Sequence, residues 1–226
     1  MQINADFDQP AFAHTQSLEW QASPMPGVER RMLDRIGGEV ARATSIVRYA
    51  KGSDFSEHTH SGGEEFIVLE GVFQDEHGDY PAGTYVRNPV GTHHIPRSEP
   101  GCTIFVKLWQ FDPADQEQFV IDLNTLPLIP EPARKGVAGG ILAERDYEMV
   151  TLEQWDAGVT SELSSDGGLE ILVLDGAIDS DGESFARHDW LRFPADARVS
   201  LRAGKDGARL WIKRGHLAQV TVPEQA

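Results

Sequence analysis

Short apolar runs, separated by Gly, Pro, Asp or Asn about every 8–12 residues, dominate this chain, and helical periodicity is nearly absent. Such a pattern predicts an all-β protein built as an antiparallel sandwich or barrel. Asp112–Val120 is the main exception, because Asp112 as cap and Pro113 at the first position favour one short helical turn. The predicted strands are Ala43–Tyr49, Glu65–Leu69, Thr84–Arg87, Thr103–Trp109, Thr151–Trp155, Glu170–Leu174, Trp190–Phe193 and Arg209–Lys213.

The strand pattern occurs twice along the chain. Ser61–Gly71 (SGGEEFIVLEG) aligns with Asp166–Gly176 (DGGLEILVLDG) at an offset of 105 residues, and Tyr80–Pro89 aligns with Phe185–Pro194 at the same offset. Matching segments that keep their order and spacing indicate an internal duplication. We therefore expect two copies of one β-domain, joined by the Pro-rich stretch Leu123–Lys135.

The repeat suggests a division of the chain into five parts. They are an N-terminal extension (1–18), a metal-binding domain (19–115), a linker (116–135), a second domain that has lost its metal (136–220) and a short tail (221–226).

Charge and cysteine content narrow the class of protein. Asp plus Glu number 36 against 20 Lys plus Arg, a net charge of −16 that disfavours nucleic acid and anionic lipid as partners. Cys102 is the only cysteine, so an intramolecular disulfide is excluded. The N-terminus has no signal-peptide pattern and the chain has no long apolar run, so we expect a cytoplasmic protein.

One stretch carries the candidate chemistry. His58, His60 and Glu64 follow the spacing H-x-H-x3-E between Gly52 and Gly71, and His94 follows a Pro-x-Gly turn further along. Residues i and i+2 of a strand share a face, so both histidines of the first motif point the same way. Three imidazoles and a carboxylate from two neighbouring hairpins predict a divalent metal site.

Other candidates are assigned structural roles. His93 should face away from the site, Glu65 should be structural because Glu170 repeats it, and Cys102 should be a buried strand residue. His14 and His77 should be solvated. The second copy carries no ligands at the matching positions, and one metal per chain is expected; those positions are Leu163, Ser165, Leu169 and Val199.

The two motifs resemble the paired cupin motifs, and Trp20–Leu33 with the segment through His94 resembles the cupin half of ChrR-type anti-sigma factors, over about residues 17–112. The resemblance implies two tandem cupin (double-stranded β-helix, or jelly-roll) barrels. It also implies zinc bound by His58, His60, Glu64 and His94, and a regulatory role in sensing oxidants. The family binds its sigma factor through a separate N-terminal domain, which we expect this chain to lack.

The residues leave the metal and the function open. Zinc is implied by the resemblance, while three histidines and a glutamate also suit Fe, Mn or Ni. The alternative is a non-haem iron(II) dioxygenase acting on a small diketone or phenolic substrate, with Glu64 as base. Its catalytic residues are otherwise unassigned, and its pocket candidates are Phe66, Tyr85, Phe105 and Trp109. Expected partners are a small-molecule ligand or oxidant, with a sigma factor left open, for a monomer or homodimer.

Overall fold

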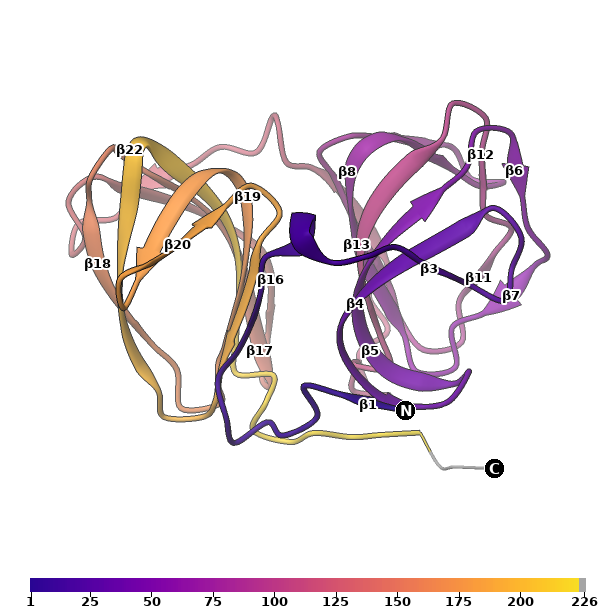
Figure 1. The fold of residues 1–226 in the computed structure, drawn as a ribbon, viewed down its shortest axis with the longest axis horizontal. Helices are drawn as coiled ribbons and strands as arrows, with labels where there is room; N and C mark the ends of the chain where they lie inside the picture. The colour runs from indigo at the N-terminus through magenta and orange to yellow at the C-terminus, as the bar shows by residue number, and fades with distance from the viewer. Residues whose placement is uncertain (224–226) are drawn as a thin grey trace. The chain divides into compact units, whose positions relative to one another are not determined.

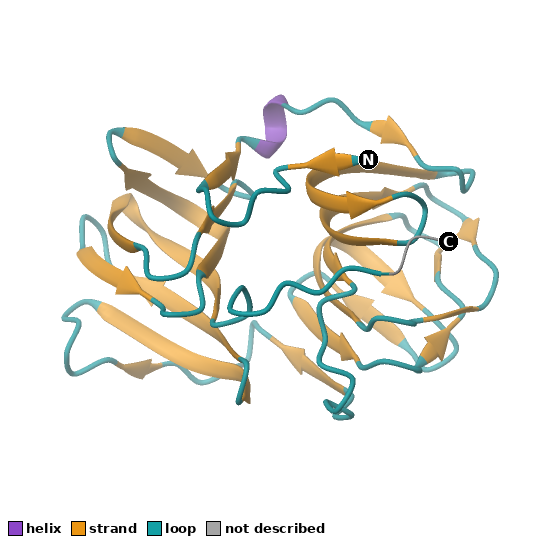
Figure 2. Cartoon of the chain, turned by 90° about the horizontal axis from the view of Figure 1, so that it is seen from below, coloured by secondary structure: helices purple, strands orange, loops and turns teal. Residues whose placement is uncertain are grey.

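Strands make up nearly all of the regular structure in the computed structural model, which describes residues 1–223 (Figures 1 and 2). Within these residues the one helical element is a 3-10 turn, η1 (Thr15–Ser17). The chain divides into two compact units, the first from residues 1–5 and 19–125 and the second from residues 6–18 and 126–220. Residues 221–223 group with the first unit, while 224–226 of the expected tail lie outside the described residues.

The first unit is an 11-stranded antiparallel sheet with a separate two-stranded ladder. Seven of its strands follow the order β1-β4-β5-β13-β8-β10-β14, the other four (β3, β6, β9 and β12) pair beside this path, and β7 pairs with β11 in the ladder. The strands are β1 (Gln2–Ile3), β3 (Gln21–Ala22), β4 (Val28–Gly37), β5 (Ala41–Tyr49), β6 (Ser53–Asp54), β7 (His58–Thr59), β8 (Glu64–Gln74), β9 (Asp79–Pro81), β10 (Thr84–Asn88), β11 (His93–His94), β12 (Arg97–Ser98), β13 (Cys102–Leu108) and β14 (Phe119–Asp122).

The second unit is a 9-stranded antiparallel sheet with the order β15-β16-β17-β22-β19-β21-β2. Its strands are β2 (Ala11–Ala13), β15 (Ile129–Pro130), β16 (Val137–Arg145), β17 (Glu148–Trp155), β18 (Thr160–Ser164), β19 (Leu169–Ser180), β20 (Glu183–Ala186), β21 (Trp190–Phe193) and β22 (Arg198–Arg214).

The strand order confirms the duplication. The series β4-β5-β13-β8-β10 of the first unit corresponds, strand for strand, to β16-β17-β22-β19-β21 of the second. The predicted all-β fold is therefore confirmed. Each main sheet runs from one edge strand to another without closing on itself in the described part of the chain, so the hydrogen bonding is that of a curled open sheet.

The predicted helical turn at Asp112–Val120 is wrong. Asp112 does cap a turn, since its Oδ1 accepts the Ala114 N–H at 2.8 Å, but the segment continues into β14. β14 pairs with β10, and the ladder bonds of a sheet edge outweigh a single local turn. In the second unit the corresponding edge position beside β21 is taken by β2, from the N-terminal segment.

Alternation along β8 separates two environments. Phe66 and Val68 are buried and pack in one apolar cluster with Ile104 and Val106 of β13. Because successive residues of a strand point to opposite faces, Glu64 shares the face of this cluster and stands at its end. The apolar cluster thus supports the site from one side.

Candidate metal centre

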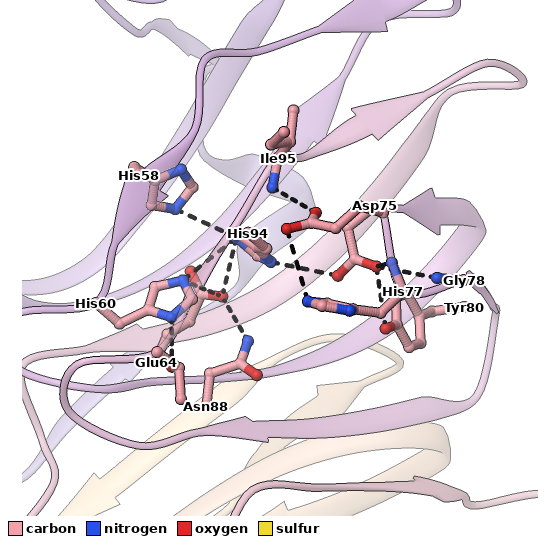
Figure 3. Close-up of polar contacts among 12 residues, drawn as sticks. His58, His60, Glu64, Asp75, His77, Gly78, Tyr80, Asn88, His94 and Ile95 are labelled. Atoms are coloured by element: carbon pink, nitrogen blue, oxygen red, sulfur yellow. Dashed lines mark hydrogen bonds and ion pairs between the residues drawn. The ribbon is translucent and has the colours of Figure 1, made fainter.

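Four predicted ligands converge at one end of the first unit. His58 and His94 are directly paired in the β7–β11 ladder, His60 follows β7, and Glu64 is the first residue of β8 (Figure 3). One donor atom from each of the four lies within 4.8 Å of the other three. His60, Glu64 and His94 are buried, whereas His58 is exposed.

The imidazole rings surround a common point. The Nε2 atom of His94 lies 3.2 Å from that of His58 and 3.3 Å from that of His60. The Oε1 atom of Glu64 lies 3.4 Å from His60 Nε2 and 3.8 Å from His94 Nε2. The three rings are nearly perpendicular in pairs, with interplanar angles of 77–83°.

Thr92 determines which nitrogen of His60 carries the proton. The Thr92 hydroxyl donates its hydrogen to the Pro89 carbonyl at 2.7 Å, and its oxygen lies 2.8 Å from His60 Nδ1. Since that hydroxyl has already donated its hydrogen, it must accept the Nδ1–H of the ring. The lone pair of His60 is therefore on Nε2, facing the other ligands.

Asp75 stands behind His94 as a nearby carboxylate rather than as a close hydrogen-bond partner. Its Oδ2 atom lies 3.5 Å from His94 Nδ1, while its Oδ1 atom accepts hydrogen bonds from the His77 and Gly78 backbone and from the Tyr80 hydroxyl (Figure 3). A carboxylate behind a ligating histidine orients the ring and raises its basicity. Burial raises the pKa of Asp75, but the hydrogen bonds to it prevail and hold that pKa below its usual value.

The side-chain amides of Asn88 and Gln118 hold the Glu64 carboxylate in place. Asn88 Nδ2 donates to Glu64 Oε1 at 3.3 Å, and Gln118 Nε2 donates to Asn88 Oδ1 at 3.0 Å. Gln118 thereby fixes which end of the Asn88 amide faces the carboxylate.

The imidazole pKa values reflect a crowded, partly dry site. Burial, followed by repulsion from His94 and His93, lowers the pKa of His60 to about 3. Burial also lowers the pKa of His58, against the attraction of Glu64. Burial acts the same way on His94, but Asp75 and Glu64 outweigh it and raise its pKa. At neutral pH the His58 and His60 rings are therefore uncharged, so each has one nitrogen lone pair.

These features suit a divalent first-row ion. Bonds of about 2.0–2.1 Å to four tetrahedral ligands place the donor atoms about 3.3–3.4 Å apart. The separations of 3.2, 3.3 and 3.4 Å given above are close to that value. A cation between the facing imidazole nitrogens and the carboxylate would be stabilised by all four groups. The donor set of three imidazoles and one carboxylate fits zinc, iron, manganese or nickel.

A cavity of about 560 Å³ opens beside the ligands. His58, His60 and Glu64 form part of its lining, and apolar side chains, including Val47, Phe55 and Leu108, form much of the remainder. Ligand pockets are commonly of this size and have mostly apolar walls with a few polar groups.

The four aromatic residues expected at the pocket lie in different places. Trp109 lines the cavity, whereas Phe66 is in the apolar core against Phe73. Tyr85 donates its hydroxyl hydrogen to Glu65, and both Tyr85 and Phe105 are buried away from the cavity lining.

The comparisons with known proteins identify this part of the chain. The family described as the ChrR cupin-like domain matches residues 8–112. Residues 8–112 are therefore similar to the ChrR cupin-like domain. None of the curated proteins matches the sequence.

Solved structures support the cupin fold over most of the chain. A candidate dioxygenase from Nostoc punctiforme has a TM-score of 0.75 at 17% identity, covering 97% of this chain and 87% of that one. A cupin 2 conserved barrel protein from Leptotrichia buccalis has a TM-score of 0.63 at 12% identity, covering 94% and 99%. A variant of oxalate decarboxylase from Bacillus subtilis has a TM-score of 0.62 at 12% identity, covering 91% and 77%.

The histidines that are not predicted to be ligands lie outside the cluster of His58, His60, Glu64 and His94. His93 is exposed and its Nε2 lies 3.7 Å from Glu57, and His77 is also exposed. His14 is only partly solvated, because its two ring nitrogens contact Glu183 and Asp189. The hydrogen bonds to Glu183 and Asp189 raise the pKa of His14 despite some burial.

Glu65 and Cys102 have structural surroundings. Glu65 is buried on the face opposite Glu64, where it accepts from Tyr85 and pairs with Arg87 at 3.3 Å. Cys102 is a buried residue of β13, and burial raises the pKa of its thiol to about 11.

The second unit has the same backbone pairing without the ligands. Leu163 pairs with Val199 as His58 pairs with His94, and Leu169 opens β19 as Glu64 opens β8. Leu163 and Leu169 belong to the apolar core, while Ser165 lies in the turn before it.

The residues behind the ligands are not among those predicted from the sequence. At the offset of 105 residues, Asp75, Asn88 and Thr92 correspond to Ser180, Phe193 and Ala197, so all three supporting groups change together with the ligands. That joint change is the signal that could have revealed them.

Membrane insertion through a helix has no support. Within residues 1–223, no helix is both long and apolar enough to cross a bilayer.

Proposed function

We propose that the first unit is a metal-dependent cupin enzyme that binds a small organic molecule and, with iron(II), oxidises it with molecular oxygen. The observation that carries this proposal is that three of the four candidate ligands line the 560 Å³ cavity. A structural metal site is closed, whereas a catalytic one leaves positions open to a substrate.

The residues of the chain have distinct roles in this proposal. His58, His60 and His94 would hold the ion through their imidazole nitrogens, and Glu64 would complete the ligand set. Iron(II) held there would supply the activation of molecular oxygen for cleavage of a carbon–carbon bond in a diketone or phenolic substrate, with both oxygen atoms entering the products. Glu64 is the buried carboxylate of the cavity lining and accepts the substrate's proton.

Tyr49 and the apolar lining have a supporting role. Burial, with Glu64 and Cys102 adding to it, raises the pKa of Tyr49, so its phenol remains neutral beside the substrate. The apolar side chains hold the body of the substrate and limit water at the reacting end.

The test combines metal analysis with oxygen uptake. The protein is purified without added metal, its metal content is determined, and oxygen consumption is measured with iron(II) and a panel of diketones and phenols. We expect iron-dependent uptake that His94→Ala abolishes and the exposed neighbour variant His93→Ala retains. Stoichiometric zinc together with no turnover on the panel would contradict the dioxygenase proposal.

A second candidate is a zinc-binding sensory cupin. It is favoured by the match of residues 8–112 to the ChrR cupin-like domain and by four protein ligands, which can fill a tetrahedral zinc site. In this candidate an oxidant or small molecule at the site alters the surface of the unit, and a sigma factor is the partner to test. Zinc that is retained on purification and lost on peroxide treatment would support it, whereas zinc retained under oxidant would not.

A further inference from the structure

The cavity contains a cationic side chain that the metal centre does not use. Arg30 is the one Lys or Arg residue in the cavity lining formed by the described residues. It lies on β4, where it pairs with Val47 of β5, and both Val47 and Val28 belong to or border the apolar core on that face. The alternation of β4 therefore directs Arg30 into the unit.

The residues on either side of Arg30 face the other way. Arg31 lies over the Trp20 ring at 4.2 Å, and Glu29 pairs with Arg48 across the strands. The charged residues on the other face of β4 thus have partners of their own. Arg30 does not share those partners, because it points to the opposite face.

The Arg30 guanidinium forms no hydrogen bond or ion pair within residues 1–223, although the residue is partly buried. Glu39 and Glu57, which also line the cavity, are exposed and do not pair with it. A charge removed from water beside apolar side chains is costly unless an opposite charge meets it. The planar guanidinium binds a carboxylate through two parallel hydrogen bonds.

The register places Arg30 away from the metal ligands. The row of paired residues through Arg30 crosses β5 at Val47, β13 at Ile104 and β8 at Val68. Val68 is four residues beyond Glu64, a separation of about 13 Å along the strand. A bound molecule whose acid group contacts Arg30 would therefore face the metal ligands with its other end.

We propose that the cavity binds an organic carboxylate, with its acid group on Arg30, its apolar body against the cavity wall, and its other end toward His58, His60 and Glu64. The inference rests on the proposed function in taking this cavity as the substrate pocket. A chain with a net charge of −16 repels anions at long range, so a local cation is needed to bind one.

The experiment compares acids with their neutral amides on the full chain, freed of metal by a chelator. The probes are three pairs of increasing length: benzoate and benzamide, 3-phenylpropionate and 3-phenylpropanamide, and 5-phenylpentanoate and 5-phenylpentanamide. Calorimetry measures each dissociation constant. We expect at least one acid to bind about tenfold or more tightly than its amide, the size of one charge-assisted hydrogen-bonded contact.

Variants assign that preference to Arg30. Arg30→Gln should remove the preference for acid over amide, Arg30→Lys should retain part of it, and Arg31→Gln should leave it unchanged although it removes the same charge from the neighbouring position. Circular dichroism and urea unfolding check that each variant is folded. Equal binding of acid and amide for all three pairs, or a preference that survives Arg30→Gln, would overturn the inference.

The two proposals fail separately. A carboxylate preference that persists in a protein that binds no metal and consumes no oxygen supports the Arg30 site and contradicts the metal-dependent enzyme. Metal binding and oxygen uptake without any carboxylate preference would support the metal-dependent enzyme and contradict the Arg30 site.

Discussion

At the residue scale, the side chains behind the histidines prepare the centre for a cation. Thr92 accepts the Nδ1–H of His60, and the Asp75 carboxylate faces Nδ1 of His94. The Thr92 hydrogen bond places the lone pair of His60 on Nε2, and the Asp75 carboxylate stands behind the His94 ring at 3.5 Å. The candidate centre is thus supported by polar groups from outside the ligand set.

Removal of the Thr92 hydroxyl should weaken metal binding. Thr92→Val keeps the shape of the side chain but leaves His60 Nδ1–H without its acceptor, and a lost supporting contact lowers metal affinity about 10- to 100-fold. Competition with a chelating dye measures the affinity. Thr59→Val, at an exposed position of β7, is the control and should retain the affinity of the unaltered protein. Equal affinities for the two variants would contradict the role of Thr92.

At the scale of elements, a tight turn delivers Glu64 to the site. Gly62 and Gly63 lie against the rings of Trp109 and Phe111, so closely that an added Cβ would meet them at 2.2 and 2.5 Å. Gly63 also has a φ of +76°, which only glycine adopts readily. Both the backbone conformation and the packing therefore require glycine in the turn before β8.

Gly63→Ala should destabilise the first unit and displace Glu64. A non-glycine residue in the left-handed region costs about 1–3 kcal/mol, and the contact with Phe111 adds to that cost. Gly52→Ala is the matched control, because Gly52 has a φ of +72° with nothing within 4 Å of the added Cβ. The free energy of unfolding, measured with urea, and the metal affinity should both be reduced more in Gly63→Ala than in Gly52→Ala. A larger loss in Gly52→Ala would show that the ring contacts are unimportant.

In the second unit an ion-pair network joins separate segments. Glu153 of β17 binds Arg134 at 2.8 Å and Arg214 of β22 at 2.9 Å, and it accepts the indole N–H of Trp155. Burial raises the pKa of Glu153, but Arg134, Arg214 and Trp155 outweigh it and hold that pKa below its ordinary value of 4.5. Its contribution to stability is therefore present above pH 4.5 and is lost as the pH falls through the depressed pKa.

Glu153→Gln should lower stability at pH 7 and reduce its dependence on acid. Loss of the charged hydrogen bonds should lower the free energy of unfolding by about 1–3 kcal/mol at pH 7, and the difference from the unaltered protein should shrink at pH 3. Urea unfolding at pH 7 and at pH 3 measures this free energy. Glu162→Gln, at an exposed position of β18, is the control. A difference that grows at pH 3 would reverse the expected sign.

At the scale of the whole molecule, one duplicated element has kept the candidate chemistry and the other has kept the core. The pairing of Leu163 with Val199 repeats that of His58 with His94, so the second unit has the same ladder filled with apolar side chains. An apolar interior gains stability from burial, whereas a ligand cluster requires an ion.

The chain should therefore bind one metal ion. Metal analysis after reconstitution and desalting should give one equivalent per chain, falling close to zero in His94→Ala and remaining at one in His77→Ala, an exposed position. Two equivalents, or one that survives His94→Ala, would mean that a different group of residues binds metal.

The sequence by itself determined the strand pattern, the duplication and the residues that converge in the metal centre. These are local or repeated signals: strand periodicity, glycine turns and a fixed offset are visible without knowledge of the fold. The helical turn predicted at Asp112–Val120 shows the limit of local signals, because the edge of β10 converts part of that segment into β14.

The tertiary structure alone decided which distant side chains support that centre and what its cavity contains. Asp75 and Thr92 lie in turns that carry no recognisable spacing, and Arg30 is one of several arginines in a charged stretch. Their roles depend on register and on the face that each side chain occupies, which strand pairing across the sheet sets. Long-range pairing leaves no periodic trace in the chain, and for that reason only the folded structure shows it.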